Sequence, residues 1–219
     1  MLKTLAAQLP LRAQQILKRH LHGHQIRNKT FSGGEPEFER LAEWIRPGDW
    51  VIDLGANVGH YTHRMSELTG PTGRVFAFEP MPQTFELLSA NVARFQHMNV
   101  TLLNVAASDR FGVVNMQVPH FGSGLDNFYM AQVTNEATDL QSMAMTVDSL
   151  NLDRRVALVK IDIEGHELHA INGMTELIRR SRPVMIVEGL DETVALRLQA
   201  LGYTWSYSAG SPNRVFIPV

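Results

Sequence analysis

From residue 35 onward, short apolar segments alternate with segments whose apolar residues recur at helical spacing. This alternation is typical of parallel strands joined by crossover helices that cover both faces of a sheet. Two short C-terminal segments suit a closing antiparallel hairpin. The sequence therefore predicts a doubly wound α/β domain with a mostly parallel, seven-stranded sheet. The predicted strands are 50–54, 74–79, 100–105, 156–161, 184–188, 203–207 and 214–217, and the predicted helices are 37–46, 58–68, 80–95, 166–180 and 192–201.

Length and composition fit one domain with one core. Of the 219 residues, 44% are hydrophobic, which supports one substantial core rather than two. No apolar run approaches the roughly 18 residues of a membrane-spanning helix, and the N-terminus lacks a continuous apolar signal segment, so we expect a soluble, cytoplasmic protein. The absence of cysteine excludes disulfides, thiolate metal sites and a cysteine nucleophile.

Residues 1–34 form a separate, basic arm. They hold six of the 20 Lys and Arg residues and no acid, which leaves 14 basic residues against all 22 acidic ones in the rest of the chain. We interpret the arm as a helical cap on the domain; membrane-surface contact, an anionic substrate and an organellar transit segment are the alternatives. Its three alternating histidines suit no single helical face and are interpreted as solvated: His20, His22 and His24. An apolar stripe interrupted by Pro10 predicts the helix: Leu2, Leu5, Leu9, Ile16, Leu17 and Leu21.

Residues 107–147 break the alternation of strands and helices. This stretch contains Gly112, Gly122 and Gly124 and only short apolar pairs, which indicates a β excursion or an irregular loop in place of a crossover helix. Irregular segments on a rigid scaffold often carry binding residues. We therefore expect this insertion to contribute to specificity.

Polar and glycine-rich residues lie at the ends of the first two predicted strands and just past them. In a doubly wound sheet, ligands bind beyond the carboxyl ends of the strands. The D-x-G-x-N-x-G spacing differs from the G-x-G-x-x-G of dinucleotide sites, and its acid would repel phosphate but suits the ammonium and sulfonium groups of S-adenosylmethionine. A carboxylate at Glu79 is placed to accept hydrogen bonds from both hydroxyls of a ribose. These residues are Asp53, Gly55, Ala56, Asn57 and Gly59 at the end of the first strand and just past it, and Glu79 and Pro80 at the end of the second and just past it.

Five motifs spread over residues 35–190 resemble those of the FkbM-type methyltransferases, and the last is the most specific. They are VIDLGANVGH (51–60), FEP (78–80), NVAASD (104–109), TVDSL (146–150) and KIDIEGHE (160–167). The resemblance implies S-adenosylmethionine as cofactor and O-methylation of a sugar, polyketide or related metabolite. It implies that Asp53, Gly55, Asn57 and Gly59 line the methionine end of the cofactor and that Glu79 holds the ribose. It also implies that Ala107, Ser108 and Asp109 lie beside the adenine.

Transfer of a methyl group to an alcohol requires a group that takes the alcohol's proton. Candidate catalytic residues at or just past the fourth and fifth predicted strands are Asp162, His166 and Glu188. We prefer Asp162, which is also expected to touch the cofactor and to pair with Lys160 on the same face of the strand. Several carboxylates at one place also suit a divalent cation such as magnesium, an alternative that we do not favour, so no metal ligand is assigned.

Two other functions are compatible with the same fold. An RNA or protein acceptor would require a basic face, but outside the arm the chain is acidic, so we expect a hydroxylated small-molecule substrate and no nucleic-acid partner. A non-catalytic scaffold is the third interpretation. The presence of Asp53, Gly55, Gly59 and Glu79 argues against it, although a fold by itself does not establish an activity.

Overall fold

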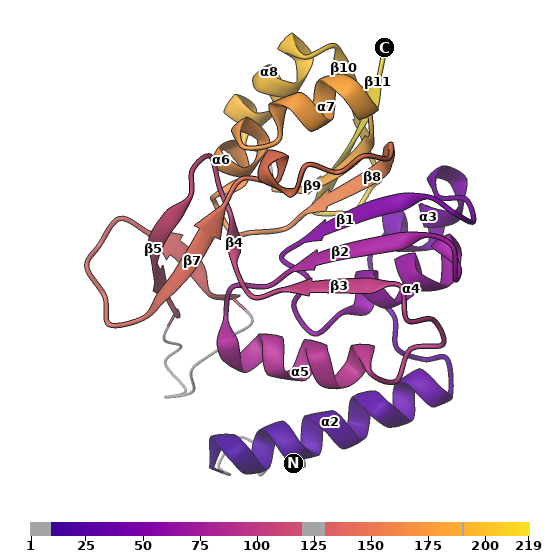
Figure 1. Cartoon of the computed structure of the whole chain (residues 1–219), viewed down its shortest axis with the longest axis vertical. Helices are drawn as coiled ribbons and strands as arrows, with labels where there is room; N and C mark the ends of the chain where they lie inside the picture. The colour runs from indigo at the N-terminus through magenta and orange to yellow at the C-terminus, as the bar shows by residue number, and fades with distance from the viewer. Residues whose placement is uncertain (1–9, 120–129, 190) are drawn as a thin grey trace.

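The computed structural model describes residues 10–119, 130–189 and 191–219 (Figure 1). Its main sheet consists of β1 (Trp50–Leu54), β2 (Arg74–Phe78), β3 (Val100–Leu103), β8 (Val156–Ile161), β9 (Val184–Glu188), β10 (Tyr203–Tyr207) and β11 (Asn213–Pro218). The strand order is β10-β11-β9-β8-β1-β2-β3. All neighbouring pairs are parallel except those of β11, which is antiparallel to β9 and β10. The predicted doubly wound, seven-stranded sheet with a C-terminal hairpin is confirmed.

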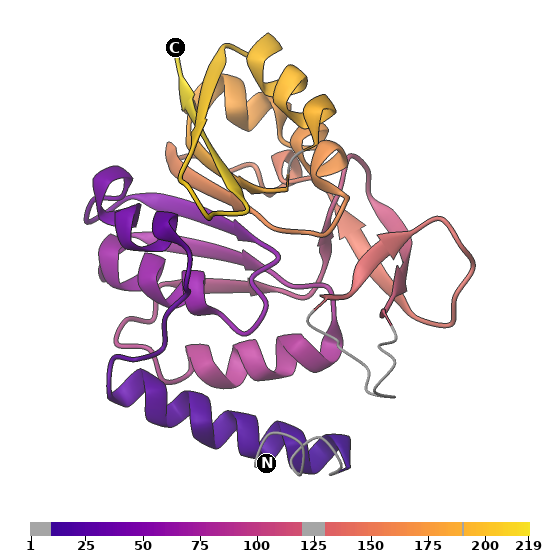
Figure 2. The same cartoon turned by 180° about the vertical axis from the view of Figure 1, so that it is seen from behind.

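Helices cover both faces of the main sheet (Figures 1 and 2). Side chains of each strand alternate between the two faces, so both faces are apolar. Val51 and Val75 belong to a buried cluster on one face, and Ile52 and Phe76 to another on the opposite face. The first face packs against α3 (Pro36–Trp44), α4 (His60–Thr69) and α5 (Pro82–Val92), and the second against α6 (Glu167–Asn172), α7 (Thr175–Ser181) and α8 (Glu192–Ala200).

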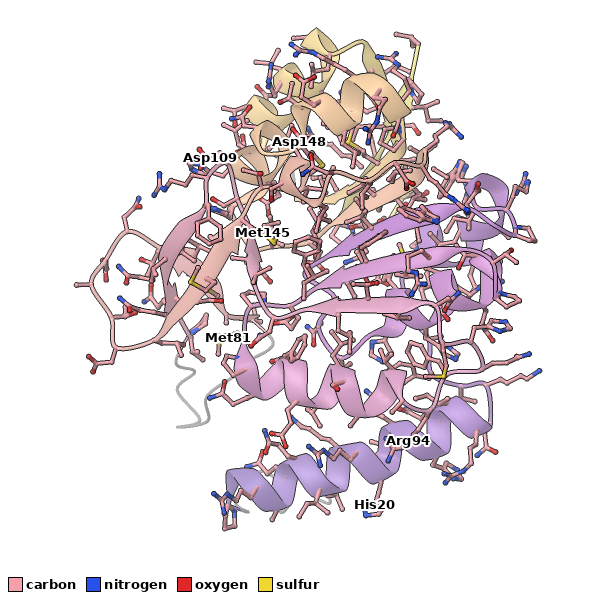
Figure 3. All side chains as sticks on the ribbon, viewed as in Figure 1. His20, Met81, Arg94, Asp109, Met145 and Asp148 are labelled. Carbon is pink, nitrogen blue, oxygen red and sulfur yellow. The ribbon has the colours of Figure 1, made fainter. Side chains whose placement is uncertain are left out.

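The helix predicted over residues 166–180 is in fact two helices, α6 and α7, which are separated at Gly173. At Gly173 the backbone passes close to the backbone of Ser108, so that a Cβ on Gly173 would lie 1.9 Å from the carbonyl oxygen of Ser108. A new helix then begins because the Asp148 carboxylate, labelled in Figure 3, accepts hydrogen bonds of 2.8 and 3.0 Å from backbone N–H groups in the first turn of α7.

A second sheet occupies the stretch that breaks the sequence pattern. Its strands are β4 (Ala106–Ala107), β5 (Gly112–Gln117), β6 (Gln132–Thr134) and β7 (Gln141–Met145), in the order β4-β7-β5-β6, and a 3-10 turn, η2 (Asp148–Leu150), follows. This sheet lies beside the carboxyl ends of β1, β2 and β3 (Figure 1). Its apolar side chains pack with Met81 at the start of α5. Gly122 and Gly124 lie outside the described residues.

The basic arm contains one described helix, α2 (Leu11–Arg27), which lies along α5 (Figures 1 and 2). Arg19 pairs with Glu86 of α5, and Ile26 packs with Leu87 of α5. Gly23 allows close approach, because a Cβ at this position would lie 3.0 Å from Nε of Arg94. Within the described part of the chain, no helix is long and apolar enough to cross a membrane.

One prediction about the arm is wrong. The predicted helix is present, with Ile16, Leu17 and Leu21 exposed because α2 turns a mixed face toward α5. His22 is not solvated, since it is buried beside Phe31 and hydrogen-bonds to Asn91. His20 and His24 are exposed, as predicted, and Leu2, Leu5 and Leu9 lie outside the described residues.

Candidate functional site

Four carboxyl side chains lie at the carboxyl ends of neighbouring parallel strands. Asp53 is in β1, directly beside Lys160 of β8 in the strand register. Glu79 follows β2, Asp162 follows β8, and Glu188 ends β9. Because β9, β8, β1 and β2 are consecutive in the sheet, these residues meet at one edge. The expected convergence of polar strand ends is therefore present.

The loop after β1 is held against both neighbouring strand ends. The backbone N–H groups of Gly55 and Ala56 both donate to the carbonyl of Phe78 in β2, at 3.0 and 2.8 Å. Gly55 has a φ of 79°, and a Cβ there would lie 1.7 Å from the carbonyl oxygen of Asp162. Glycine is therefore required at this position both by its conformation and by its surroundings.

Glu79 is a buried carboxyl group held by the backbone on two sides. Its Oε2 accepts a hydrogen bond from the N–H of Asn57 and its Oε1 accepts one from the N–H of Met81, both at 2.9 Å. The residue is 6% exposed. Burial raises the pKa of Glu79 to about 7, and the two backbone hydrogen bonds only partly oppose this. The orientation of the carboxyl group is thus fixed before any ligand binds.

Lys160 supplies the positive charge of the site. It is 4% exposed, its Nζ lies 2.7 Å from Oδ2 of Asp162, and it sits 4.6 Å from the ring centroid of Tyr61. Burial alone would lower the pKa of Lys160, but the carboxylates of Asp162 and Asp53 outweigh burial and raise it. The predicted ion pair between Lys160 and Asp162 is present, and Lys160 stays charged.

Asp162 and Glu188 share a hydrogen bond. This bond, followed by burial, raises the pKa of Glu188 to about 8, so Glu188 carries the proton at neutral pH. Burial would raise the pKa of Asp162, but Lys160 and the hydrogen bonds from Glu188 and Lys160 prevail and lower it. Asp162 is therefore an ionised carboxylate between a protonated acid and an ammonium group.

Two buried polar atoms at the site have no hydrogen-bond partner among the described residues. Asp53 is fully buried, and its Oδ2 accepts a 2.6 Å hydrogen bond from Thr62, but its Oδ1 has no donor. The hydroxyl of Tyr61 is likewise unpartnered. Buried polar groups are normally hydrogen-bonded, so these two atoms are suited to a ligand.

Two cavities adjoin the carboxyl cluster and share Gly55, Asn57 and Asp162 in their walls. The larger has a volume of about 450 Å³, and Asp53, Ala56, His60, Tyr61 and Lys160 line it together with residues of the N-terminal arm. The smaller runs toward the second sheet and is lined by Glu79, Pro80, Ala107, His166 and the apolar side chains Met116, Ala131 and Val133.

His166 lies on the side of the smaller cavity and does not line the larger one. Its Nε2 is 3.0 Å from Oγ of the buried Ser108, and its ring stacks on His169, which in turn contacts Asp109 at 2.9 Å. Burial lowers the pKa of His166 to about 4, so the ring is neutral at physiological pH. Ser108 faces a neighbouring cavity that it shares with His166.

Two other predicted site residues, Gly59 and Glu188, do not line the two cavities. Gly59 begins α4 with a φ of 97°, and a Cβ there would lie 2.8 Å from Leu88, so its role is to pack α4 against α5. Glu188 lines neither of the two cavities but hydrogen-bonds to Asp162, which lines both. In the part of the chain that is described, no group of three or more His, Cys, Asp or Glu side chains is arranged to hold a metal ion.

The N-terminal arm supplies site residues that the sequence patterns did not reveal. Lys18, Leu21 and His22 of α2 line the larger cavity, as does Glu35 just beyond the arm. Burial is the main reason that the pKa of His22 falls to about 4, and burial also lowers the pKa of Lys18. The only signal in the sequence was the acid-free, basic composition of residues 1–34.

The sequence matches a known family. The model of the methyltransferase FkbM domain matches residues 53–203. The hexuronic acid methyltransferase AglP of Haloferax volcanii is 28% identical over 170 residues, which are 73% of this chain and 64% of that protein. The 31-O-demethyl-FK506 methyltransferase FkbM of Streptomyces tacrolimicus is 28% identical over 196 residues, covering 73% of this chain and 74% of that protein. The chain thus spans about two-thirds to three-quarters of these relatives.

Solved structures share the fold. The methyltransferase FkbM of Methylobacillus flagellatus superposes with a TM-score of 0.57 at 16% identity, over 94% of this chain and 59% of that chain. Fibrillarin of Aeropyrum pernix, solved with natively bound S-adenosylmethionine, gives 0.52 at 13% identity, over 80% and 68%. The architecture is that of the class I S-adenosylmethionine-dependent methyltransferases.

Proposed function

The chain belongs to the FkbM methyltransferase domain family, and on that premise we propose that it transfers the methyl group of S-adenosylmethionine to a hydroxyl group of a small metabolite. The observation that carries this proposal is the pair of cavities that share Gly55, Asn57 and Asp162. Such an arrangement provides one cavity for a nucleoside and one for an acceptor, with a common wall where the methyl group would pass.

The donors and acceptors at the cavities fit S-adenosylmethionine. The fixed carboxyl group of Glu79 faces the smaller cavity and would hold the ribose hydroxyls, while Ala107 and the apolar side chains of the second sheet would enclose the adenine. The unpartnered Oδ1 of Asp53, which lines the larger cavity, is suited to a cationic donor such as the ammonium group of the methionine end, so that end of the cofactor would pass the common wall into the larger cavity. When bound, the cofactor supplies a methyl group on a positively charged sulfur.

The rest of the larger cavity, beyond Asp53, fits the acceptor. Its volume of about 450 Å³ lies in the range of roughly 300–1,000 Å³ that is usual for small-molecule sites. The two relatives described above are methyltransferases, named for a hexuronic acid and for a demethylated FK506. These names favour a hydroxylated sugar or polyketide, and not a nucleic acid, as the acceptor of this chain.

Asp162 is the group that we assign to accept the proton of the acceptor hydroxyl. It lines both cavities, so it lies beside any atom that reaches their common wall. Lys160 keeps it ionised, and the proton on Glu188 fixes its orientation, which makes Glu188 a positioning residue. A carboxylate with a lowered pKa is a weak base, so most of the rate enhancement is assigned to alignment of the reactants in the cavity. His166 is assigned to the cofactor side.

The test is transfer of a labelled methyl group from S-adenosylmethionine to a panel of sugars, uronic acids and polyketide alcohols. We expect Asp162→Asn to lower kcat by about 10²-fold, the lower end of the usual contribution of a general base because Asp162 is a weak one, while the cofactor still binds. Asp153→Asn, which changes an exposed carboxylate, is the matched control. Labelling of RNA or protein in place of the panel, or cofactor binding with no acceptor at all, would overturn the proposal.

A further inference from the structure

The side of α2 that faces away from α5 is apolar and basic at once. Ile16, Leu17 and Leu21 are 56%, 52% and 55% exposed, values that are unusual for three large aliphatic residues within two turns. His20 points away from α5 on this same side (Figure 3). We call this surface the outer face of α2, and its exposed residues are Arg12, Ile16, Leu17, His20, Leu21, His24 and Arg27.

The orientation of α2 is fixed by its opposite side. Arg19 pairs with Glu86, Ile26 packs with Leu87, and the close approach at Gly23 sets Arg94 against the helix. Rotation of α2 to bury its leucines would break all three contacts. The apolar residues of the outer face are therefore presented to the surroundings by the folded domain itself.

The charge of the arm indicates what covers this face. Of the five Lys and Arg residues in 10–34, Arg19 pairs with Glu86 and Lys18 lines the larger cavity, so the outer face itself carries Arg12 and Arg27 and no acid. Two such faces would bring like charges together. A nucleic acid would match the charge but would leave the leucines in water. An anionic bilayer satisfies both, because basic side chains contact the headgroups and apolar ones enter the boundary of the acyl chains. We propose that the outer face of α2 binds the surface of an anionic lipid bilayer.

Binding in this manner would bring the larger cavity close to the lipid. Leu21 belongs to the outer face and also lines that cavity, together with Lys18 and His22 of the same helix. The acceptor would then reach the cavity along the membrane surface. Lipid binding can be measured without turnover, so its failure would leave the proposed methyl transfer untouched, and a failure of methyl transfer would leave lipid binding untouched.

The experiment is co-sedimentation of the full chain with phosphatidylcholine vesicles that contain either no anionic lipid or about one-third phosphatidylglycerol, a fraction chosen to give a strong negative surface potential. We expect binding to the anionic vesicles only, weakened by added salt. Leu17→Glu should reduce the partition coefficient by about tenfold, since it removes an apolar contact and adds a repelled charge. Neither Ile16 nor Leu17 lines either of the two cavities described above, so Ile16→Glu is a second, independent variant with the same expected result.

Leu196→Glu is the matched control, because Leu196 is an equally exposed helical leucine, 63% accessible, in α8 on another part of the molecule. This variant should bind anionic vesicles like the unchanged chain. Unfolding by urea would verify that all variants are folded. The proposal is overturned if the full chain does not distinguish the two vesicle types, or if Leu17→Glu and Leu196→Glu bind equally.

Discussion

A Cβ atom on Gly55 would lie only 1.7 Å from the carbonyl oxygen of Asp162. The two residues follow the adjacent strands β1 and β8, and both line both cavities. The two strand ends thus approach each other closely at the wall that the two cavities share, and the missing side chain of Gly55 leaves room for the carbonyl group of Asp162.

Gly55→Ala should therefore destabilise the fold. An alanine here would combine the strain of a positive φ with a direct overlap, and each effect typically costs about 1–3 kcal/mol. We expect the free energy of unfolding in urea to fall by about 3 kcal/mol or more. Gly34→Ala is the control, since a Cβ there meets nothing within 4 Å. Equal stabilities of the two variants would contradict this account.

Lys160→Met should be among the most damaging single substitutions in the chain. The buried carboxylates of Asp53 and Asp162 would lose their shared positive charge, and breaking a buried ion pair from one side costs about 3–5 kcal/mol. Urea unfolding would measure this loss. Arg179→Met, which breaks an exposed pair with Glu176, should change stability by no more than about 1 kcal/mol. Similar effects of the two substitutions would disprove the assigned role of Lys160.

The proton shared by Glu188 and Asp162 predicts a pH dependence of stability. The pKa of Glu188 is raised to about 8 in the folded chain, whereas a free glutamate titrates near 4.3. Its protonated form therefore stabilises the fold fully below about pH 4, and this contribution is lost as the pH rises toward and through 8.

Glu188→Gln isolates this effect, because the amide still donates a hydrogen bond to Asp162 but does not titrate in this range. The free energy of unfolding of the unchanged chain, minus that of the variant, should decrease steadily between about pH 5 and 8. A difference that is constant over this range would show that Glu188 is not the proton carrier.

The main sheet could be predicted from sequence because the local apolar pattern of each strand agrees with its burial in the folded domain. Apolar runs such as Val156–Ile161 are buried on both faces, so their pattern alone identifies them as strands. The break at Gly173 could not be predicted in this way. It depends on contact with Ser108, which lies 65 positions earlier, and on capping of α7 by Asp148, and neither is visible in the local pattern.

The carboxyl residues of the site could also be predicted from the sequence, whereas the residues from the N-terminal arm could not. Asp53, Glu79 and Asp162 lie at or just past the carboxyl ends of predicted strands, and the topology of a parallel sheet brings such positions together. The contribution of α2 was not predictable, because the side of an isolated helix that faces the domain depends on its partner. Contacts with α5 bury the polar His22 and leave the apolar Leu17 exposed. The burial of these two residues is therefore the opposite of what their hydrophobicity alone predicts.

The most direct test of the account is calorimetric titration of the full chain with S-adenosylmethionine, compared with Glu79→Ala and with the exposed control Glu176→Ala. Loss of the Glu79 carboxyl group leaves the backbone N–H groups of Asn57 and Met81, and the ribose, without an acceptor, at a cost of about 1–3 kcal/mol. We predict saturable binding to the full chain and to Glu176→Ala, and binding weakened about 5- to 150-fold in Glu79→Ala. Absence of binding to the full chain, or an unchanged dissociation constant in Glu79→Ala, would contradict the account.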